Sequence, residues 1–286
     1  MQTRFPASVL VDAHVHVHPG FARDAFLDAA LANFRREAAE MGLRDEVLGC
    51  LLLAEMGPAR WFRRARNGEE GSGLWSFERT AELESLVARR ISREDQDEKL
   101  LVIAGRQIAT REGLEVLALA CDADVPDGLP FGETLHRVRA CGALPVLPWG
   151  FGKWWGRRGR LVAGALERRG SAPLFLGDNA GRPALGSAPH LFQKAQAHGI
   201  AVLPGSDPLP LPWHASRAGS FGVLLEGGLD AERPAADLRR RVRELREGPR
   251  AFGRLAPLPR FVRDQVALRG RRPAAQPGEG TVEVTP

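Results

Sequence analysis

The chain has 286 residues, 44% of them hydrophobic and 26% charged, which is ordinary for a globular protein and allows one large α/β domain or two smaller ones. Its net charge of +5 comes almost entirely from arginine, because Lys99, Lys153 and Lys194 are the only lysines. Basic residues are spread along the sequence and acidic residues are nearly as many, so we expect no specific nucleic-acid binding. Arginines brought together by folding can still steer an anionic substrate.

The sequence gives no sign of a membrane or secretory protein. No apolar run approaches the roughly 18 residues that cross a bilayer, and the N-terminus lacks the basic and apolar regions of a signal peptide. We therefore expect a cytoplasmic protein without a membrane partner. Cys50, Cys121 and Cys141 cannot all pair and form no CxxC motif, so we expect buried, reduced thiols.

Strand-like apolar runs alternate with helix-like amphipathic runs, which predicts a mostly parallel sheet or barrel. In chain order we expect a strand at 9–17, a helix at 22–41 and a strand at 47–55. Segment 56–76 is Gly-rich, basic and aromatic and indicates a long loop or lid over one barrel end, with WFRRAR at 61–66 as a helix or lid surface. A helix is expected at 77–91.

The second half of the chain continues the alternation without an internal repeat. The runs 100–109 and 114–120 are joined only by the turn TREG, so they should pair antiparallel. A single domain is expected over 1–269, followed by a disordered tail at 270–286. The remaining elements are expected as strands at 143–148, 173–177, 200–204 and 220–225, and as helices at 131–141, 160–169, 188–198, 233–247 and 258–269.

The first strand carries the strongest functional signal, the sequence VDAHVHVHPG. Strand side chains alternate faces, which predicts Val11, Ala13, Val15 and Val17 on one face and Asp12, His14, His16 and His18 on the other. Histidines at i and i+2 aim their ring nitrogens at one point, as a divalent ion requires, and Asp12 is a candidate to orient an imidazole. The alternatives are a phosphate site, or a chance alternation with histidines bonded to backbone. His18 is equally a ligand or a loop residue.

This pattern resembles the polymerase-and-histidinol-phosphatase (PHP) family of metal-dependent phosphoesterases. VDAHVHVHPG resembles the family's H-x-H motif, and the stretches VIAGRQIATREGLEVLALA, RVRACGALPVLPWGFGK, LFLGDN and AQAHGIAVLPGSDPLP resemble four further motifs in the same order. The resemblance covers roughly 9–225. It implies a seven-stranded distorted TIM-like α/β barrel that binds up to three divalent metals.

Several positions depart from the family pattern. Gln107 stands where the family has a glutamate ligand, and Glu115 or Leu114 stands near a usual histidine. Pro148 and Trp149 replace a His-Pro pair of the family. Glu55 and Met56 stand where the second strand of the family ends in the sequence TDH. In the last motif Asp207 is kept, but Leu209 replaces a histidine. The remaining candidates can complete one coordination sphere rather than three, and they are His14, His16, Asp207, Glu55 and Asp178.

The other candidates have competing interpretations. Asp207 can be a ligand or a turn residue before proline, and Glu55 and Asp178 can act as ligand, general base or structural carboxylate. Gln107 is a candidate to contact the substrate, or to contact one of the residues that hold the metal. In the loop WGFGKWWGRRGR, Trp149 can stack on a ligand, and Lys153, Arg157 and Arg158 can hold an anion. The alternative is that this loop is a solvent-exposed rim of the barrel.

The favoured hypothesis is a hydrolase, most readily a phosphoesterase, with one divalent ion (zinc, manganese or iron) held by His14, His16 and Asp207. Its partner would be a small anionic substrate, for example a phosphorylated one. One alternative is a family member that has lost catalysis and binds a phosphorylated small molecule or a partner protein. Another is amide or C–N hydrolysis at a mononuclear site.

Overall fold

The computed structural model of the protein describes residues 4–70, 73–91, 97–122, 124–185, 188–245 and 248–270. The tail expected at 270–286 therefore lies outside the described residues, apart from Gly270, which ends the last helix. Within the described residues, no helix has the length and apolar character needed to cross a membrane.

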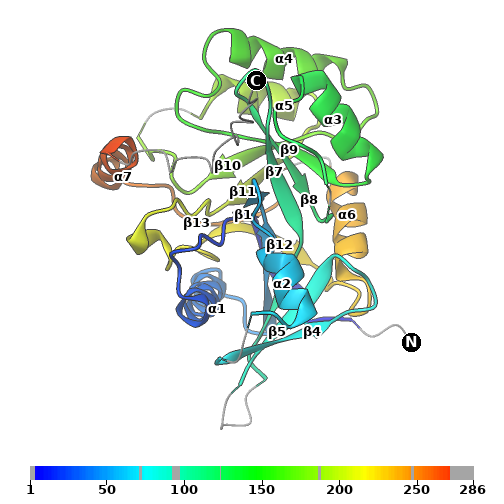
Figure 1. Cartoon of the computed structure of the whole chain (residues 1–286), viewed down its shortest axis with the longest axis vertical. Helices are drawn as coiled ribbons and strands as arrows, with labels where there is room; N and C mark the ends of the chain where they lie inside the picture. The colour runs from blue at the N-terminus through cyan, green and yellow to red at the C-terminus, as the bar shows by residue number, and fades with distance from the viewer. Residues whose placement is uncertain are drawn as a thin grey trace, which may run out of the picture.

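The described chain is a mixed α/β fold with two sheets (Figure 1). The first has the strand order β13(Ala251–Gly253)–β12(Phe221–Glu226)–β1(Ser8–Val15)–β2(Val47–Leu53)–β6(Lys99–Ile103)–β5(Ser85–Arg90)–β4(Trp75–Arg79). The second has the order β11(Val202–Gly205)–β10(Phe175–Asn179)–β9(Leu144–Pro148)–β8(Glu115–Leu119)–β7(Gly105–Ala109)–β3(Glu55–Met56).

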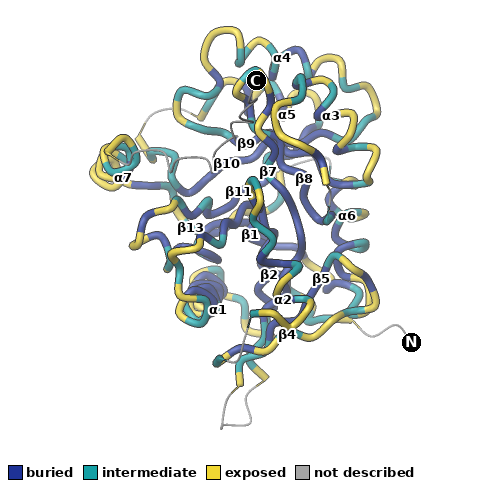
Figure 2. Tube along the Cα trace, in the orientation of Figure 1, coloured by how far each residue is buried: buried dark blue, intermediate teal, exposed yellow. Residues whose placement is uncertain are grey.

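Helices cover the outer faces of both sheets. Helices α1(Arg23–Glu40) and α2(Trp61–Asn67) pack on the first sheet, and α3(Phe131–Ala140), α4(Arg157–Arg168) and α5(His190–Ala197) pack on the second. The central core lies between the sheets, and α6(Pro234–Glu244) closes one end of it through Leu238 and Val242. The helix α7(Leu258–Gly270) lies at the side and is largely exposed (Figure 2).

The two sheets come together along β1 and β11. The backbone N–H of Asp207 donates to the carbonyl of His14 over 2.8 Å, just beyond the last residue of β11. Carboxyl ends of the parallel strands β1, β9, β10 and β11 therefore meet at one edge. Side chains that follow these strands gather there, as in other α/β proteins.

The predicted alternation of the first strand is wrong at one point. The pairing of β1 with β2 shifts register between Asp12 and Val15, which is the mark of a β-bulge. Val9, Val11 and Ala13 face the central core, whereas Leu10 and Val15 face α1. The bulge thus reverses the alternation, so that Asp12 does not share a face with His14 and His16.

Further expectations need correction. The helix expected at 77–91 is the antiparallel hairpin β4–β5, in which Leu86 and Ala88 alternate into the core under α1. Good helix formers occupy this segment, but the hairpin is held from outside it, because the Glu82 carboxylate accepts the backbone N–H groups of Ala235 and Ala236 at the start of α6. The expected loop 56–76 contains helix α2, in agreement with the helical interpretation of WFRRAR.

The run expected as one strand at 100–109 is divided between the two sheets. β6 ends at Ile103 and β7 begins at Gly105, where a Cβ atom would lie 2.1 Å from the carbonyl oxygen of Leu53. The antiparallel pairing expected for 100–109 and 114–120 is confirmed for β7 and β8. All three cysteines are free, but Cys141 is exposed rather than buried.

Gly205 should be essential for the approach of the two sheets. A Cβ atom on it would lie 2.4 Å from the backbone nitrogen of His14 and 2.5 Å from its Cβ. We expect Gly205→Ala to lower the free energy of unfolding by about 1–3 kcal/mol through overpacking, measured by urea denaturation. Gly132→Ala is the control, since nothing lies within 4 Å of its added Cβ. Equal effects of the two changes would contradict this account.

Candidate metal centre

Three side chains from the two sheets converge at the meeting edge. Nε2 of His14 lies 3.0 Å from Nε2 of His16. Oδ1 of Asp207 lies 3.6 Å from Nε2 of His14 and 3.4 Å from Nε2 of His16. In the described part of the chain this is the one group of histidine, cysteine and carboxylate side chains close enough together to hold a metal ion.

The spacing suits a divalent ion. Bonds of about 2.0–2.2 Å to nitrogen and oxygen place neighbouring ligand atoms about 3.0–3.5 Å apart in octahedral and tetrahedral geometry. The three observed separations are close to that range. Nδ1 of His14 is buried without a hydrogen-bond partner, so the polar contacts of this imidazole are made through Nε2, the atom that faces the cluster. The donor set therefore fits a metal.

The protonation states also favour a metal. Burial lowers the pKa of His14, which keeps its imidazole neutral and its lone pair free. Burial acts to raise the pKa of Asp207, but its close contacts with His14 and His16 and the positive charge of Lys153 bring it below its usual value. Asp207 is therefore an anion over the physiological pH range.

Local structure fixes Asp207 in its place. Its backbone adopts a left-handed conformation with φ of 45°, which aspartate tolerates better than most residues. Nδ2 of Asn179, at the end of β10, donates to Oδ2 of Asp207 over 3.1 Å and to the carbonyl of Trp149 over 2.9 Å. Asn179 thus links three strand ends and leaves Oδ1 of Asp207 to face the histidines.

Asp12 supports the cluster through the backbone rather than through an imidazole. Its Oδ1 accepts the N–H groups of Ser206 and His14, and its Oδ2 accepts that of Gly219. Burial raises the pKa of Asp12 to about 7, and these hydrogen bonds oppose that shift. The suggestion that Asp12 orients a histidine ring is replaced by a role in holding the surrounding chain.

Two more residues reach the cluster from β7 and from the loop after β9. Oε1 of Gln107 lies 3.3 Å from Nε2 of His14, which places Gln107 beside the candidate ligands. Lys153 pairs with the carboxylate of Glu115, and the charges of both groups act on the cluster. The loop at 149–158 and His14 therefore lie at the same end of the strands.

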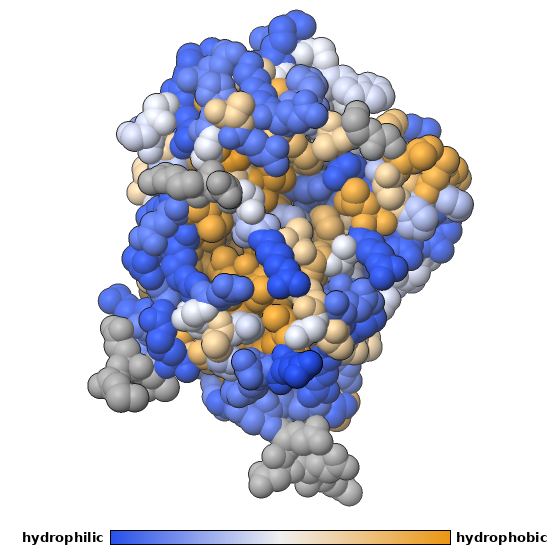
Figure 3. Space-filling model, turned by 180° about the vertical axis from the view of Figure 1, so that it is seen from behind, coloured by the Kyte–Doolittle hydropathy of each residue, from blue (hydrophilic) through white to orange (hydrophobic). Residues whose placement is uncertain are grey.

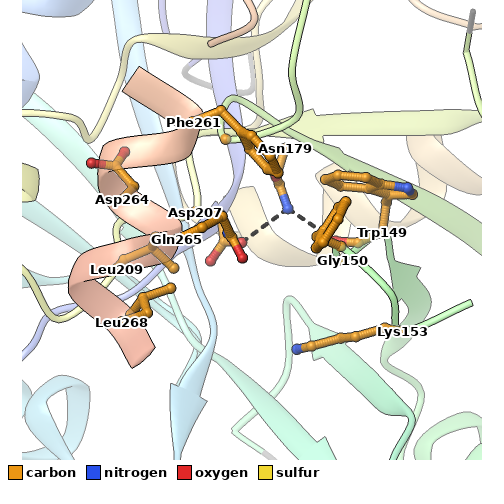
Figure 4. Close-up of a pocket in the computed structure, with 12 residues that line it drawn as sticks. Trp149, Gly150, Lys153, Asn179, Asp207, Leu209, Phe261, Asp264, Gln265 and Leu268 are labelled. Carbon is orange, nitrogen blue, oxygen red and sulfur yellow. Dashed lines mark hydrogen bonds between the residues drawn. The ribbon is translucent and has the colours of Figure 1, made fainter. Parts of the chain in front are cut away.

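A pocket of about 190 Å³ opens beside Asp207. In Figure 4 Asp207 and Asn179 form one side of it, Trp149 and Lys153 another, and helix α7 a third, with the ammonium group of Lys153 directed into the space. From α7 come Phe261, Gln265 and Leu268. Of the three metal candidates Asp207 lines this cavity, together with one cation and several apolar side chains.

Glu55 and Asp178 lie outside this cluster. Oε1 of Glu55 accepts the backbone N–H of Phe62 over 3.1 Å at the start of α2, and burial raises its pKa. Asp178 forms a bidentate salt bridge with Arg182, whose Nε and Nη2 donate to Oδ1 and Oδ2 over 2.7 and 2.8 Å. Both carboxylates are used in structural contacts, and neither belongs to the group able to hold a metal.

The remaining predicted residues are dispersed. Arg157 is exposed at the start of α4 and does not line the pocket. Arg158 donates to the carbonyls of Gly152 and Gly113, which ties the loop to the turn between β7 and β8. His18 is buried, with Nε2 2.7 Å from the carbonyl oxygen of Pro208, and is not part of the metal group.

The contribution of α7 to the site was not anticipated. The sequence predicted this helix but gave no signal for its position. It is held by Asp264, which is 3% exposed and contacts Nε2 of His214 over 3.0 Å and Nε1 of Trp213 over 2.9 Å. Nδ1 of His214 accepts the backbone N–H of Leu209 over 3.0 Å, so this neutral histidine joins α7 to the segment after Asp207.

Comparisons with known proteins give the fold and nothing finer. No family model matches the sequence, and no curated protein matches it. Among solved structures the chain is similar to PsfC from Pseudomonas syringae PB-5123, at 16% identity and a TM-score of 0.53, over 92% of this chain and 98% of that one. The likeness at this identity supports the mixed α/β fold alone.

The buried pair of His214 and Asp264 should make stability depend on pH. Burial lowers the pKa of His214 from 6.5 to about 4. The unfolded chain therefore binds a proton before the folded chain does, and stability is lost as pH falls through this range. We expect a loss of about 2–3 kcal/mol between pH 6.5 and 4 that His214→Gln removes.

Urea denaturation at several pH values measures this slope. His136→Gln is the control, because His136 is exposed on α3. An unchanged slope in the His214 variant, or an equal change in the His136 variant, would show that another group governs the acid sensitivity.

Proposed function

We propose that the protein is a divalent-metal-dependent hydrolase with a mononuclear site that acts on a small phosphorylated substrate. The observation that carries the proposal is the convergence of His14, His16 and Asp207, because Asp207 also lines a pocket that contains Lys153. We further propose that the two sheets are the halves of an open, distorted barrel. The close approach of β1 to β11 and of β2 to β7 supports this interpretation.

The resemblance to the PHP family supports the same reading. At two positions where that family has ligands this chain has neutral side chains, and both lie at the site: Gln107 contacts His14, and Leu209 lines the pocket. A neutral amide and an aliphatic chain add no negative charge with which to hold further cations. One ion is therefore the expected content.

On this proposal each side chain has a defined task. His14, His16 and Asp207 would hold the ion, which when bound polarises the scissile group and acidifies a water molecule. Asn179 keeps one oxygen of Asp207 turned away from the histidines. Lys153 would bind a non-reacting oxygen of the phosphate, and Trp149 and Phe261 would exclude bulk water from the pocket.

Metal content is the first test. We expect the purified protein to bind about one equivalent of zinc, manganese or iron, because the donor set completes one sphere. His14→Ala and Asp207→Ala should abolish binding, and Asn179→Ala should weaken it by roughly 10- to 100-fold, as expected for a residue that orients a ligand. Elemental analysis and calorimetric titration measure these quantities.

His190→Ala serves as the matched control, since His190 begins helix α5 outside the cluster. Two or three equivalents that persist after mild chelation would contradict a mononuclear site. No bound metal in the parent protein would refute the assignment of the centre.

Activity is the second test, and Lys153 provides its sharpest form. Lys153→Ala should lower kcat/KM for p-nitrophenyl phosphate in the metal-loaded protein by roughly 10- to 100-fold, as a charge-assisted contact to phosphate is lost. Arg157→Ala removes the same charge from the same loop outside the pocket and should leave the rate unchanged. A metal-loaded protein that binds phosphate but hydrolyses no phosphate ester would favour the degenerate binding protein instead.

A further inference from the structure

A second pocket, of about 510 Å³, lies apart from the metal centre. Three segments form it: helix α1, η1(Pro212–His214) with the stretch that follows it, and helix α7. It shares no lining residue with the pocket beside Asp207. Figure 4 shows that Asp264 of α7 points away from Asp207, and Arg260 and Arg263, which precede Asp264 in the same helix, line this second pocket.

The lining of this pocket is strongly basic. Four arginines contribute to it, one from α1, one from the 212–220 stretch and two from α7, and no acidic residue is among the described residues that line it. These arginines are Arg36, Arg217, Arg260 and Arg263. The spread of basic residues along the sequence concealed this cluster, since its members lie up to 227 positions apart, from 36 to 263.

The nearby acids do not neutralise the cluster. Glu37 pairs with Arg36 over 2.8 Å, and Asp264 is shared among Arg217, Arg263 and His214. Four guanidinium groups thus face two carboxylates, which leaves an excess of two positive charges. Like charges at this density repel one another, and a bound anion relieves that repulsion.

Arg217 gives an independent sign of a missing partner. It is 8% exposed and lines the pocket, and its Nη2 is buried with no hydrogen-bond partner. Burial lowers the pKa of Arg217, Asp264 raises it, and the neighbouring Arg260 lowers it further. A buried, incompletely paired guanidinium is costly to retain.

Two of the other guanidinium groups are held in position. The Arg263 guanidinium lies 4.8 Å from the centre of the Trp213 ring, a cation–π contact. Nη1 of Arg36 donates to Oδ1 of Asn33 over 2.8 Å. Arginines fixed in this way lose little freedom when they bind an anion, and their planar geometry matches phosphate oxygens.

We propose that this arginine pocket is a binding site for a small molecule that carries a diphosphate or triphosphate group. The excess of positive charge calls for a ligand with at least two negative charges. A hollow bounded by three segments suits a compact group, whereas a nucleic-acid backbone requires an extended basic strip.

Calorimetric titration with inorganic pyrophosphate tests the proposal. The protein is first freed of metal with a chelator, and His14→Ala/His16→Ala serves as the background that removes the metal centre. We expect one molecule of pyrophosphate per chain in both proteins, with affinity that falls as salt is added. Failure of the hydrolase proposal leaves this result unaffected, since the metal centre is absent from the background variant.

The double variant Arg260→Ala/Arg263→Ala should weaken pyrophosphate binding at least about tenfold, because two charge-assisted contacts are lost. Arg240→Ala/Arg243→Ala is the control, because it removes the same charge from α6, outside this pocket. No binding to the parent protein would overturn the proposal, as would equal weakening in the two double variants. Loss of binding in the His14→Ala/His16→Ala background alone would assign the anion to the metal centre.

Discussion

The carboxylate of Asp12 holds together three backbone segments at the point where the two sheets meet. It accepts N–H groups from the bulge of β1, from the residue after β11 and from the loop before β12. A buried acceptor satisfied in this way is expensive to remove, because each freed N–H would be left without a partner. The bulge, the close approach at Gly205 and the orientation of His14 all depend on this arrangement.

The bulge explains how one strand serves both a core and a site. Up to Ala13 the inward positions of β1 are apolar and pack between the sheets, whereas beyond it the inward positions are His14 and His16. An unbroken strand of this sequence would keep Asp12 on the same face as the histidines. One additional residue places Asp12 among backbone donors and leaves the imidazoles facing Asp207.

Much of the fold could be predicted because its signals are local. The helices after residue 130 and the antiparallel pair β7–β8 follow from periodicity and turn length. The hairpin β4–β5 could not be predicted in this way, because Glu82 is bound to the start of α6, far away in sequence. The bulge left no local mark either, since the residues that bind Asp12 beside it, Ser206 and Gly219, lie far away in sequence.

The candidate site likewise has residues that could be predicted from the sequence and residues that could not. His14, His16, Asp207, Gln107, Trp149 and Lys153 could be selected from motifs, and the structure brings them together. Glu55 and Asp178 have the same chemistry but are used at the start of α2 and on Arg182, which no motif reveals. The arginine pocket was hidden for a similar reason, because charge density depends on the path of the chain rather than on composition.

Helix α7 lies between the two pockets and is attached mainly by polar contacts. Of its residues only Asp264 is buried, and Leu258, Val262 and Val266 are 46%, 49% and 63% exposed. In the reversed view of Figure 3 hydrophobic residues appear at the right-hand edge, the side on which α7 lies. Detaching a helix whose one buried side chain is a carboxylate costs less free energy than detaching a helix with a buried apolar face.

The charges around the metal candidates bear on the class of substrate that we propose. Asp207 and Glu115 are negative, Lys153 is positive, and the two histidines are the remaining members. With a divalent ion and neutral imidazoles the proposed centre would carry a net charge of +1, since +2 and +1 are opposed by two carboxylates. A centre of this charge attracts an anion and can bind a phosphate ester without a second metal.

If Gln107 were a glutamate, the net charge of the centre would be zero. The site would then favour a second cation over a single substrate phosphate. The neutral residue at position 107 thus accounts for both the reduced metal content and the anionic substrate that we propose.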